Sequence, residues 1–598
     1  VVVERACAGG GRRLALAVVV ATMQMLTGAP EIIFLTWVLL AAFGLRLLIT
    51  ANRRRSATLV RLMILPVAVV ALAAAQLLPF LDLLSHSQRD AHFADSYGSM
   101  PIWGWANLLV PMFNCFTKFF GVYAQFGQYW TSSYYPGIGV LLLAILAALE
   151  APERRVWILT AVAICGLILA LGDEGHLYKW LRTTVPQFGF MRYPIKFVVL
   201  PTFCIPLLAA AALNRLTSSS RPMADKRSGL FILFLGALVL MSVAGIVWFA
   251  WRYPALRGTW QTTWPNALSR GAFLIATVSI LKVLLRPHCP GTGIIAGAAL
   301  VALVGLDGWT HMPRQNPVIN RAAFEPGRLR LDPQPRIGES RAMISPAAEA
   351  RFHQFGSTDA FNDYVVSRLG LYINCNLLDE IPKVDGIFSL YLRAPNRIEE
   401  GLLKASRDPG QELAPLLDFL GVSHITAPGE FFNWTNRPAA LPFVTAGQRP
   451  VFADDNAIFR SLASLSFAPR ETVYLPLEAE SLIQVTNRTD TKVLSFRFSA
   501  HRGDIEVAGS RPGLLVIAQA YYPRWRASID GSDQKLLRAN LGYQALQIPP
   551  GRHSVEMSYR DFAFHFGVLV SVAALVVCAG VWISSATNFA SSDSTAIG

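Results

Sequence analysis

Long apolar stretches recur along the first half of the chain and once more near its C-terminus. They cover residues 14–29, 31–50, 58–80, 136–150, 156–172, 196–213, 230–251, 269–286, 293–309 and 566–583. A helix needs roughly 20 mostly apolar residues to cross a bilayer. The pattern therefore predicts an α-helical polytopic membrane protein with about ten transmembrane helices. The closely spaced first pair and the short stretch 136–150 fit this criterion least well.

Composition supports a membrane protein over a soluble one. The chain has 598 residues, of which 53% are hydrophobic and 15% are charged, and its mean hydropathy is +0.39. Soluble domains average about 25% charged residues. These values exclude a disordered, collagen-like or disulfide-scaffold protein.

The net charge of +14 does not point to nucleic acid, because of where the basic residues lie. Residues 310–565 carry 28 Lys and Arg against 27 Asp and Glu, whereas the remainder carries 25 against 12. With the N-terminus inside, the basic residues gather in the short inner loops, as expected for cytoplasmic loops. The basic residues concerned are Arg5, Arg12, Arg13, Arg53, Arg54, Arg55, Arg154, Arg155, Arg215, Arg221, Lys226, Arg227, Lys282 and Arg286. This alternation predicts that both termini lie inside and that residues 310–565 lie outside.

The large outer segment changes its pattern along its length. Residues 310–460 are mixed, and Leu416–Val422 reads as a helix that ends at Gly421 before a short strand. From 461 to 565 apolar and polar residues alternate, and turn pairs such as Asp530-Gly531 separate the alternating runs. We therefore expect four parts: a membrane domain (1–309), a mixed α/β region (310–460), an antiparallel β-sandwich (461–565), and a last transmembrane helix with a cytoplasmic tail (566–598).

The predicted outer loop 81–135 is rich in aromatic rings and polar side chains. Its rings include Tyr134 and Tyr135, and its carboxylates include Asp82 and Asp90. One interpretation is a belt of rings at headgroup depth. The other is a surface that binds a sugar or lipid, with Tyr134 and Tyr135 as ring contacts and Asp82 or Asp90 as a base.

Two cations, Arg192 and Lys196, lie four residues apart where a predicted span begins on the outer side. Together they suit a phosphate or pyrophosphate head group. The alternative is that both side chains simply extend to lipid phosphates.

The seven cysteines show no disulfide framework. Only Cys115 and Cys375 are expected outside, where unpaired cysteines are the commoner case although a disulfide between them is an alternative. The sequence has no CxxC, HExxH or paired-histidine spacing, so no metal or other cofactor is predicted.

Three stretches together resemble the YfhO-like family of bacterial multi-spanning membrane proteins, which are relatives of GT-C glycosyltransferases. The first is Met23–Glu31, similar to a "Q-x-L-x-G-H-P-E" turn with Ala29 in place of the histidine. The second is Pro186–Lys196, in which Arg192, Pro194 and Lys196 match a "P-x-x-x-x-F-R-x-P-x-R/K" run. The third and most specific runs from Tyr521 through Asp530-Gly531, Arg538-Ala539-Asn540 and Pro550–His553, with Arg524 where glycine is common.

This resemblance implies a GT-C-like fold and a glycosyltransferase, or part of one, in the bacterial inner (cytoplasmic) membrane. Such an enzyme moves a sugar from a polyprenyl-phosphate donor to an envelope polysaccharide or teichoic-acid-like acceptor on the outer face. In GT-C enzymes the acidic catalytic residue lies in the first outer loop. Because a block of spans that precedes the first motif in relatives is not seen before Val1, we expect a fragment and keep Glu31 only as a weak candidate. More simply, Glu31 marks the membrane boundary.

The third motif is interpreted mainly as a fold signature. Trp525, Ala527 and Ile529 alternate inward, and Asp530-Gly531 suits a type I′ hairpin. A ligand site in 521–553 is the alternative.

A second class of function stays open, namely a non-catalytic envelope scaffold or a flippase or transporter component. Transporters place charges within broken helices near the bilayer midplane. The apolar stretches offer few such residues: Arg61 lies near the inner end of its stretch and the uncharged Gln76 near an outer end. This argues against a transporter and leaves the scaffold open.

Overall fold

The computed structural model describes residues 1–50, 55–89, 98–117, 122–150, 153–185, 191–217, 226–254, 260–285, 290–313, 315–355, 357, 359–405 and 413–594. The chain divides into two units. Unit 1 comprises residues 1–76, 90–317 and 567–598, and unit 2 comprises residues 77–89 and 318–566.

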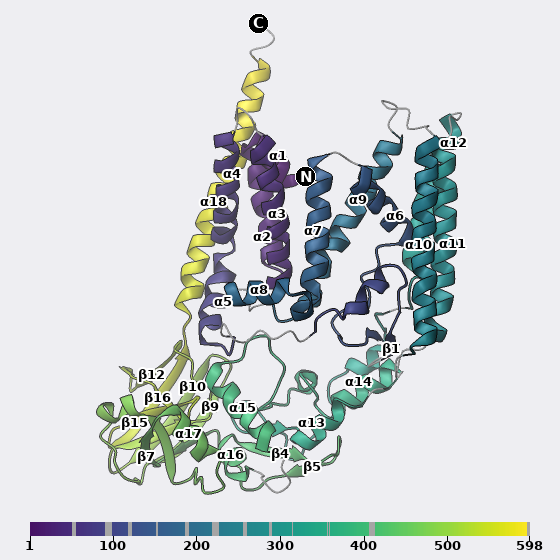
Figure 1. Cartoon of the computed structure of the whole chain (residues 1–598). Coiled ribbons are helices and arrows are strands. Elements are labelled where there is room, and N and C mark those ends of the chain that lie inside the picture. Colours follow the sequence, from purple (N-terminus) through teal and green to yellow (C-terminus); the bar gives the residue numbers. More distant parts are fainter. Residues whose placement is uncertain are drawn as a thin grey trace. The chain divides into compact units, whose positions relative to one another are not determined.

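Unit 1 is built from helices (Figure 1). They are α1 (Val2–Gly9), α2 (Gly11–Met25), α3 (Pro30–Thr50), α4 (Arg55–Leu72), the start of α5 (Ala74–His86), α6 (Ile138–Glu150), α7 (Arg154–Ala170), α8 (Leu177–Thr184), α9 (Val199–Thr217), α10 (Lys226–Arg252), α11 (Trp260–Leu284), α12 (Pro290–Thr310) and α18 (Phe562–Ser594). Short 3₁₀ helices cover Ile102–Leu108, Gly172–Gly175 and Pro194–Val198, and β1 (Cys115–Thr117) pairs with β2 (Tyr123–Gln125).

Seven helical stretches in the described part of the chain are long and apolar enough to cross a membrane. They are 30–50, 55–72, 194–217, 229–252, 260–284, 293–310 and 562–585. The other three predicted spans are also helical but shorter, because α2, α6 and α7 contain 15, 13 and 17 residues. These helices indicate a membrane protein.

The predicted span 58–80 is interrupted. Helix α4 ends at Leu72, and α5 begins at Ala74. The Ala75 amide donates to the Ser571 hydroxyl of α18 at 3.0 Å, so a neighbouring side chain replaces a bond of the helix ladder. Gly567 permits this approach, because a Cβ there would lie 2.5 Å from the Ala74 carbonyl oxygen.

Contacts within unit 1 show which helix ends lie next to one another. Lys196, just before α9, meets Glu31 at the start of α3. At the far end of α9, Arg215 donates to the Glu150 carbonyl at the end of α6. Near the start of α2, Arg12 donates to the Trp582 carbonyl in α18. Each contact joins ends that the predicted alternation assigns to the same side.

The alternation yields a direct prediction for the whole chain. A reporter fused after Thr217 is expected on the inner side of the membrane, and one inserted at Asp533 on the outer side. At each position, two reporters are fused in separate experiments: one that is active only outside the membrane and one that is active only inside. Their activities show on which side the position lies. Both positions reporting the same side would contradict the proposed topology.

Unit 2 combines short helices with β-strands. Its helices, besides most of α5, are α13 (Pro346–Phe352), α14 (Ala360–Leu369), α15 (Arg393–Ala405), α16 (Ala414–Phe419) and α17 (Asp455–Leu462), with 3₁₀ helices at Arg321–Phe324, Cys375–Asp379 and Leu477–Leu482. Its strands are β3 (Arg341–Met343), β4 (Val422–Thr426), β5 (Trp434–Asn436), β6 (Val444–Ala446), β7 (Arg449–Ala453), β8 (Thr472–Pro476), β9 (Lys492–Phe498), β10 (Arg502–Gly509), β11 (Gly513–Ile517), β12 (Trp525–Ile529), β13 (Ser532–Gln534), β14 (Leu537–Ala539), β15 (Tyr543–Ile548) and β16 (Gly551–Tyr559).

Two antiparallel sheets form the C-terminal part of unit 2, in the orders β13-β12-β16-β10-β9 and β14-β15-β11-β6. One core cluster contains Ile505 and Trp525 from the first sheet and Ile517 and Leu546 from the second. Residues from both sheets therefore share a core, as in a sandwich. Because β6 starts at Val444, the sheets draw on residues before the expected boundary at 461.

Local predictions for unit 2 agree with the structure. Asp530 and Gly531 have φ values of 50° and 81° and join β12 to β13, as a type I′ turn requires. Gly421 has a φ of 67° between α16 and β4, where the helix was expected to end. Trp525, Ala527 and Ile529 are buried on one face of β12.

Candidate functional site

Charged and aromatic side chains of unit 1 come together where α3 and α9 begin. The Lys196 ammonium lies 3.0 Å from the Glu31 carboxylate. It also lies 5.7 Å from the ring centre of Trp130 and 5.3 Å from that of Tyr193. We call Glu31, Trp130, Arg192, Tyr193 and Lys196 the Lys196 cluster.

The chain around Lys196 sets the position of its cations. Pro194 begins a 3₁₀ turn that continues into α9, and its fixed φ suits the first position of a helix. Arg192 lies just before this turn, with its guanidinium carbon 5.4 Å from the Tyr193 ring centre. Two cations four residues apart thus share one aromatic ring.

Glu31 is held from the other side by α3. It is the second residue of that helix, where the helix dipole favours a carboxylate. Its side chain is 11% exposed, against 27% for Lys196, so the pair is partly shielded from water. An ammonium has three donors, and the bond to Glu31 uses one of them.

Trp130 is fixed by two buried glutamines, Gln125 and Gln128, in the aromatic-rich segment that was predicted as the outer loop 81–135 (hereafter the aromatic loop). The Gln128 side-chain oxygen accepts from the backbone amides of Trp130 and Thr131, and its nitrogen donates to Gln125. The Trp130 ring packs against Tyr193 at 3.9 Å between centres with 39° between the ring planes, yet it remains 50% exposed. One face of the ring is therefore held, and the rest stays accessible.

The backbone of Gly98 packs against the Trp130 and Tyr193 rings of the cluster. Its carbonyl accepts from the Ile195 amide at 3.3 Å, and its φ is 71°. A Cβ at this position would approach both Trp130 and Tyr193 to 2.9 Å. Only glycine therefore lets the two rings pack against the backbone here.

The other predicted site residues lie elsewhere. Tyr134 is 4% exposed and donates to the Gly104 carbonyl while accepting from Gln125, so it supports the aromatic loop from within. Tyr135 donates to the Asp307 carboxylate at 2.9 Å. Asp90 lies outside the described residues, and Cys115 and Cys375 are both free.

Asp82 belongs to unit 2 and is bound there. Arg524 donates to both of its carboxylate oxygens, at 2.6 and 3.0 Å, and the Tyr522 hydroxyl donates at 2.5 Å. The hydrogen bond from Arg524 is the main cause that lowers the pKa of Asp82 below its ordinary value. A carboxylate held in this way is suited to tying α5 to the sandwich rather than to accepting a proton.

One buried ion pair was not anticipated from the sequence. Arg270 of α11 is 1% exposed and pairs with Asp307 of α12, which is 3% exposed. Arg270 also donates to the Thr310 hydroxyl at 3.0 Å, and Asp307 accepts from the Ile138 amide at 2.8 Å. Because protein groups surround both charges, the pair joins α6, α11 and α12. The only signal in the sequence was an arginine at the start of the apolar stretch 269–286 and an aspartate at the end of the next stretch, 293–309.

Among the described residues, no group of three or more His, Cys, Asp or Glu side chains is placed to hold a metal ion. The Lys196 cluster instead offers two cations, one carboxylate and an exposed indole face. This set suits an anionic group attached to a flat or ring-shaped moiety. Comparisons of the chain with models of protein families, with curated proteins and with solved structures find no match.

Proposed function

We propose that this membrane protein binds a polyprenyl-phosphate-linked sugar and acts as a GT-C-type glycosyltransferase, or as part of one. The observation that carries the proposal is the ion pair between Glu31 and Lys196. These residues are 165 positions apart and come from two of the three motifs that resemble the YfhO-like family. Because they meet beside Arg192, we infer that residues of both motifs bind the same ligand.

The charges of the Lys196 cluster suit a sugar phosphodiester. Arg192 and Lys196 place two cationic side chains in the cluster, and a phosphodiester carries the negative charge that such side chains bind. Arg192 can bind phosphate oxygens in pairs, whereas Lys196 supplies a point charge. A lipid phosphate lies at the boundary of the hydrocarbon, because its tail stays in the membrane and its charge cannot follow.

The same groups suit the transfer step. The acceptor hydroxyl oxygen attacks the anomeric carbon, and the bond from that carbon to the phosphate oxygen breaks. The polyprenyl phosphate leaves with the electron pair, and Arg192 and Lys196 stabilise its charge. Once Lys196 engages the phosphate, the Glu31 carboxylate is free to accept the acceptor's proton. Trp130 offers its ring to the sugar.

The proposal predicts a graded response at Arg192. In cells that lack the native copy, Arg192→Lys is expected to lower the transferred sugar of the envelope. Arg192→Ala is expected to lower it further, about tenfold or more, since hydrogen bonds to charged groups contribute about 1.5–3 kcal/mol. The measurement is envelope sugar content at matched protein level in the membrane.

A control separates binding from simple anchoring. Lys282, an exposed cation in the last turn of α11, is expected to tolerate Lys282→Ala. Side chains that only reach toward lipid phosphates tolerate either cation. Full activity of both Arg192 variants would therefore leave the anchoring interpretation and contradict the proposal. Binding of the lipid-linked sugar without transfer by wild type would favour the non-catalytic scaffold or flippase.

A further inference from the structure

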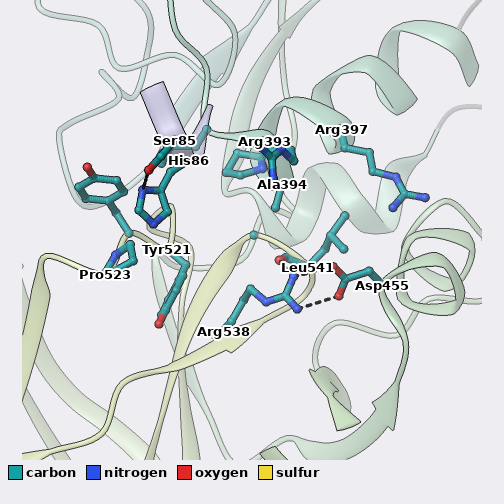
Figure 2. Close-up of a pocket in the computed structure, with 14 residues that line it drawn as sticks. Ser85, His86, Arg393, Ala394, Arg397, Asp455, Tyr521, Pro523, Arg538 and Leu541 are labelled. Atoms are coloured by element: carbon teal, nitrogen blue, oxygen red, sulfur yellow. Dashed lines mark hydrogen bonds and ion pairs between the residues drawn. The ribbon is translucent and has the colours of Figure 1, made fainter. Parts of the chain in front are cut away.

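A pocket of about 350 Å³ lies within unit 2, between the start of α15 and the loops of the sandwich (Figure 2). This volume is at the lower end of the range for small-molecule sites. Tyr521, Tyr522, Pro523 and Arg538, all from the third motif, line it. The motif thus does more than close the sandwich, because part of it faces a cavity.

The lining of the pocket is cationic. It holds Arg393, Arg397 and Arg538 but one carboxylate, that of Asp455. Arg538 donates two hydrogen bonds of 2.8 and 2.9 Å to Asp455, and a dashed line joins the two residues in Figure 2. The Asp455 charge is therefore matched, and two guanidinium groups remain in excess.

Arg393 is the cation best placed for a ligand. It is exposed, and it forms no ion pair with any residue that the structure describes. Arg397, in contrast, donates to the Asn456 side chain at 2.8 Å and lies over the Phe459 ring. Among the residues that the structure describes, Asn456 and Phe459 thus hold Arg397 in position, whereas Arg393 has no charged partner.

The first turn of α15 adds a second attraction for an anion. Arg393 begins this 13-residue helix, and Ala394 and Pro395 line the pocket. The positive end of the helix dipole therefore faces the cavity. Gly542 allows the close packing here, because a Cβ on it would lie 2.7 Å from the Pro395 nitrogen.

Two tyrosines and His86 also line the pocket. Tyr521 is half-buried, and its backbone amide donates to the Gly542 carbonyl at 2.8 Å, which fixes the start of its side chain. His86 packs edge-on against Tyr522 at 5.3 Å. Tyrosine rings and arginine side chains in the lining of one pocket suit a sugar with one charged substituent.

We propose that this pocket binds a sugar that carries an anionic group, either a carboxylate or a phosphate. Arg393 and the start of α15 bind the anion, and Tyr521 packs on the ring. This proposal does not depend on the transferase function, because it concerns soluble sugars and residues of unit 2 alone.

The test uses the full-length protein in detergent and calorimetric titration with four probes at equal ionic strength. The probes are glucuronate, glucose 6-phosphate, glucose and inorganic phosphate. We expect saturable binding of glucuronate, of glucose 6-phosphate or of both, and the stronger one identifies the anion. Glucose and inorganic phosphate are expected to bind at least about tenfold more weakly, because each lacks one half of the recognised group.

Two variants locate the binding. Arg393→Gln is expected to weaken binding about tenfold, and Tyr521→Ala to weaken the charged sugars more than inorganic phosphate. The matched control is Arg526→Gln, an exposed arginine on β12 that does not line the pocket. Three results would overturn the proposal: no saturable binding of either charged sugar, equal binding of glucose, or equal loss in the Arg393 and Arg526 variants.

Discussion

Replacement of Arg270 by alanine is expected to destabilise the helices of unit 1 by about 3–5 kcal/mol, the usual range for breaking a buried ion pair. The substitution leaves the Asp307 carboxylate buried at 3% exposure without its guanidinium. Tyr135 and the Ile138 amide still donate to that carboxylate, but neither carries a positive charge. The measurement is unfolding of the purified protein in mixed micelles with increasing SDS.

Two further variants make this result specific. Arg252→Ala removes an exposed arginine from the last turn of α10 and is expected to change stability little. In the double variant Arg270→Leu with Asp307→Leu both charges are gone, so much of the lost stability is expected to return. If Arg270→Ala unfolds at the same SDS fraction as wild type, the pair does not hold these helices together.

The second large effect is expected at Trp525. Trp525→Ala removes a ring that is 8% exposed from the sandwich core and is expected to cost about 3–5 kcal/mol. The ring also packs edge-on against Tyr559 at 5.8 Å, so the variant loses an aromatic pair as well as buried area. Pulse proteolysis of unit 2 in the full-length protein measures the change.

The neighbouring residue supplies the control for Trp525. Arg526 lies on the same strand with its side chain exposed on the opposite face, and Arg526→Ala is expected to stay within about 0.5 kcal/mol of wild type. Equal protease resistance of the Trp525 and Arg526 variants would show that Trp525 does not support the core.

Features of the fold that depend on neighbouring residues could be predicted from the sequence. Apolar runs of helical length predicted the long helices, because burial in hydrocarbon acts on each segment separately. The Asp530-Gly531 turn followed from residues that tolerate positive φ. The inward alternation of Trp525, Ala527 and Ile529 followed from the two-residue period of a strand.

Features that depend on distant pairing could not be predicted. Arg192 and Lys196 were recognised as a cationic pair, but nothing local indicates that Glu31 meets Lys196 or that Trp130 lies over it. Likewise, Asp82 looked like a candidate base until its bonds to Arg524, 442 positions away, showed its charge to be matched. At the interruption of the span 58–80, the Ala75 amide donates to Ser571, which is 496 positions away.

The most direct measurement is equilibrium binding of a short-chain polyprenyl-phosphate sugar to the full-length protein in nanodiscs. The Lys196 cluster predicts saturable binding that Lys196→Ala weakens about tenfold or more, that Arg192→Lys weakens less, and that Lys282→Ala leaves unchanged. Equal affinity of wild type, Lys196→Ala and Lys282→Ala for the lipid-linked sugar would contradict the assignment of this cluster as the donor site.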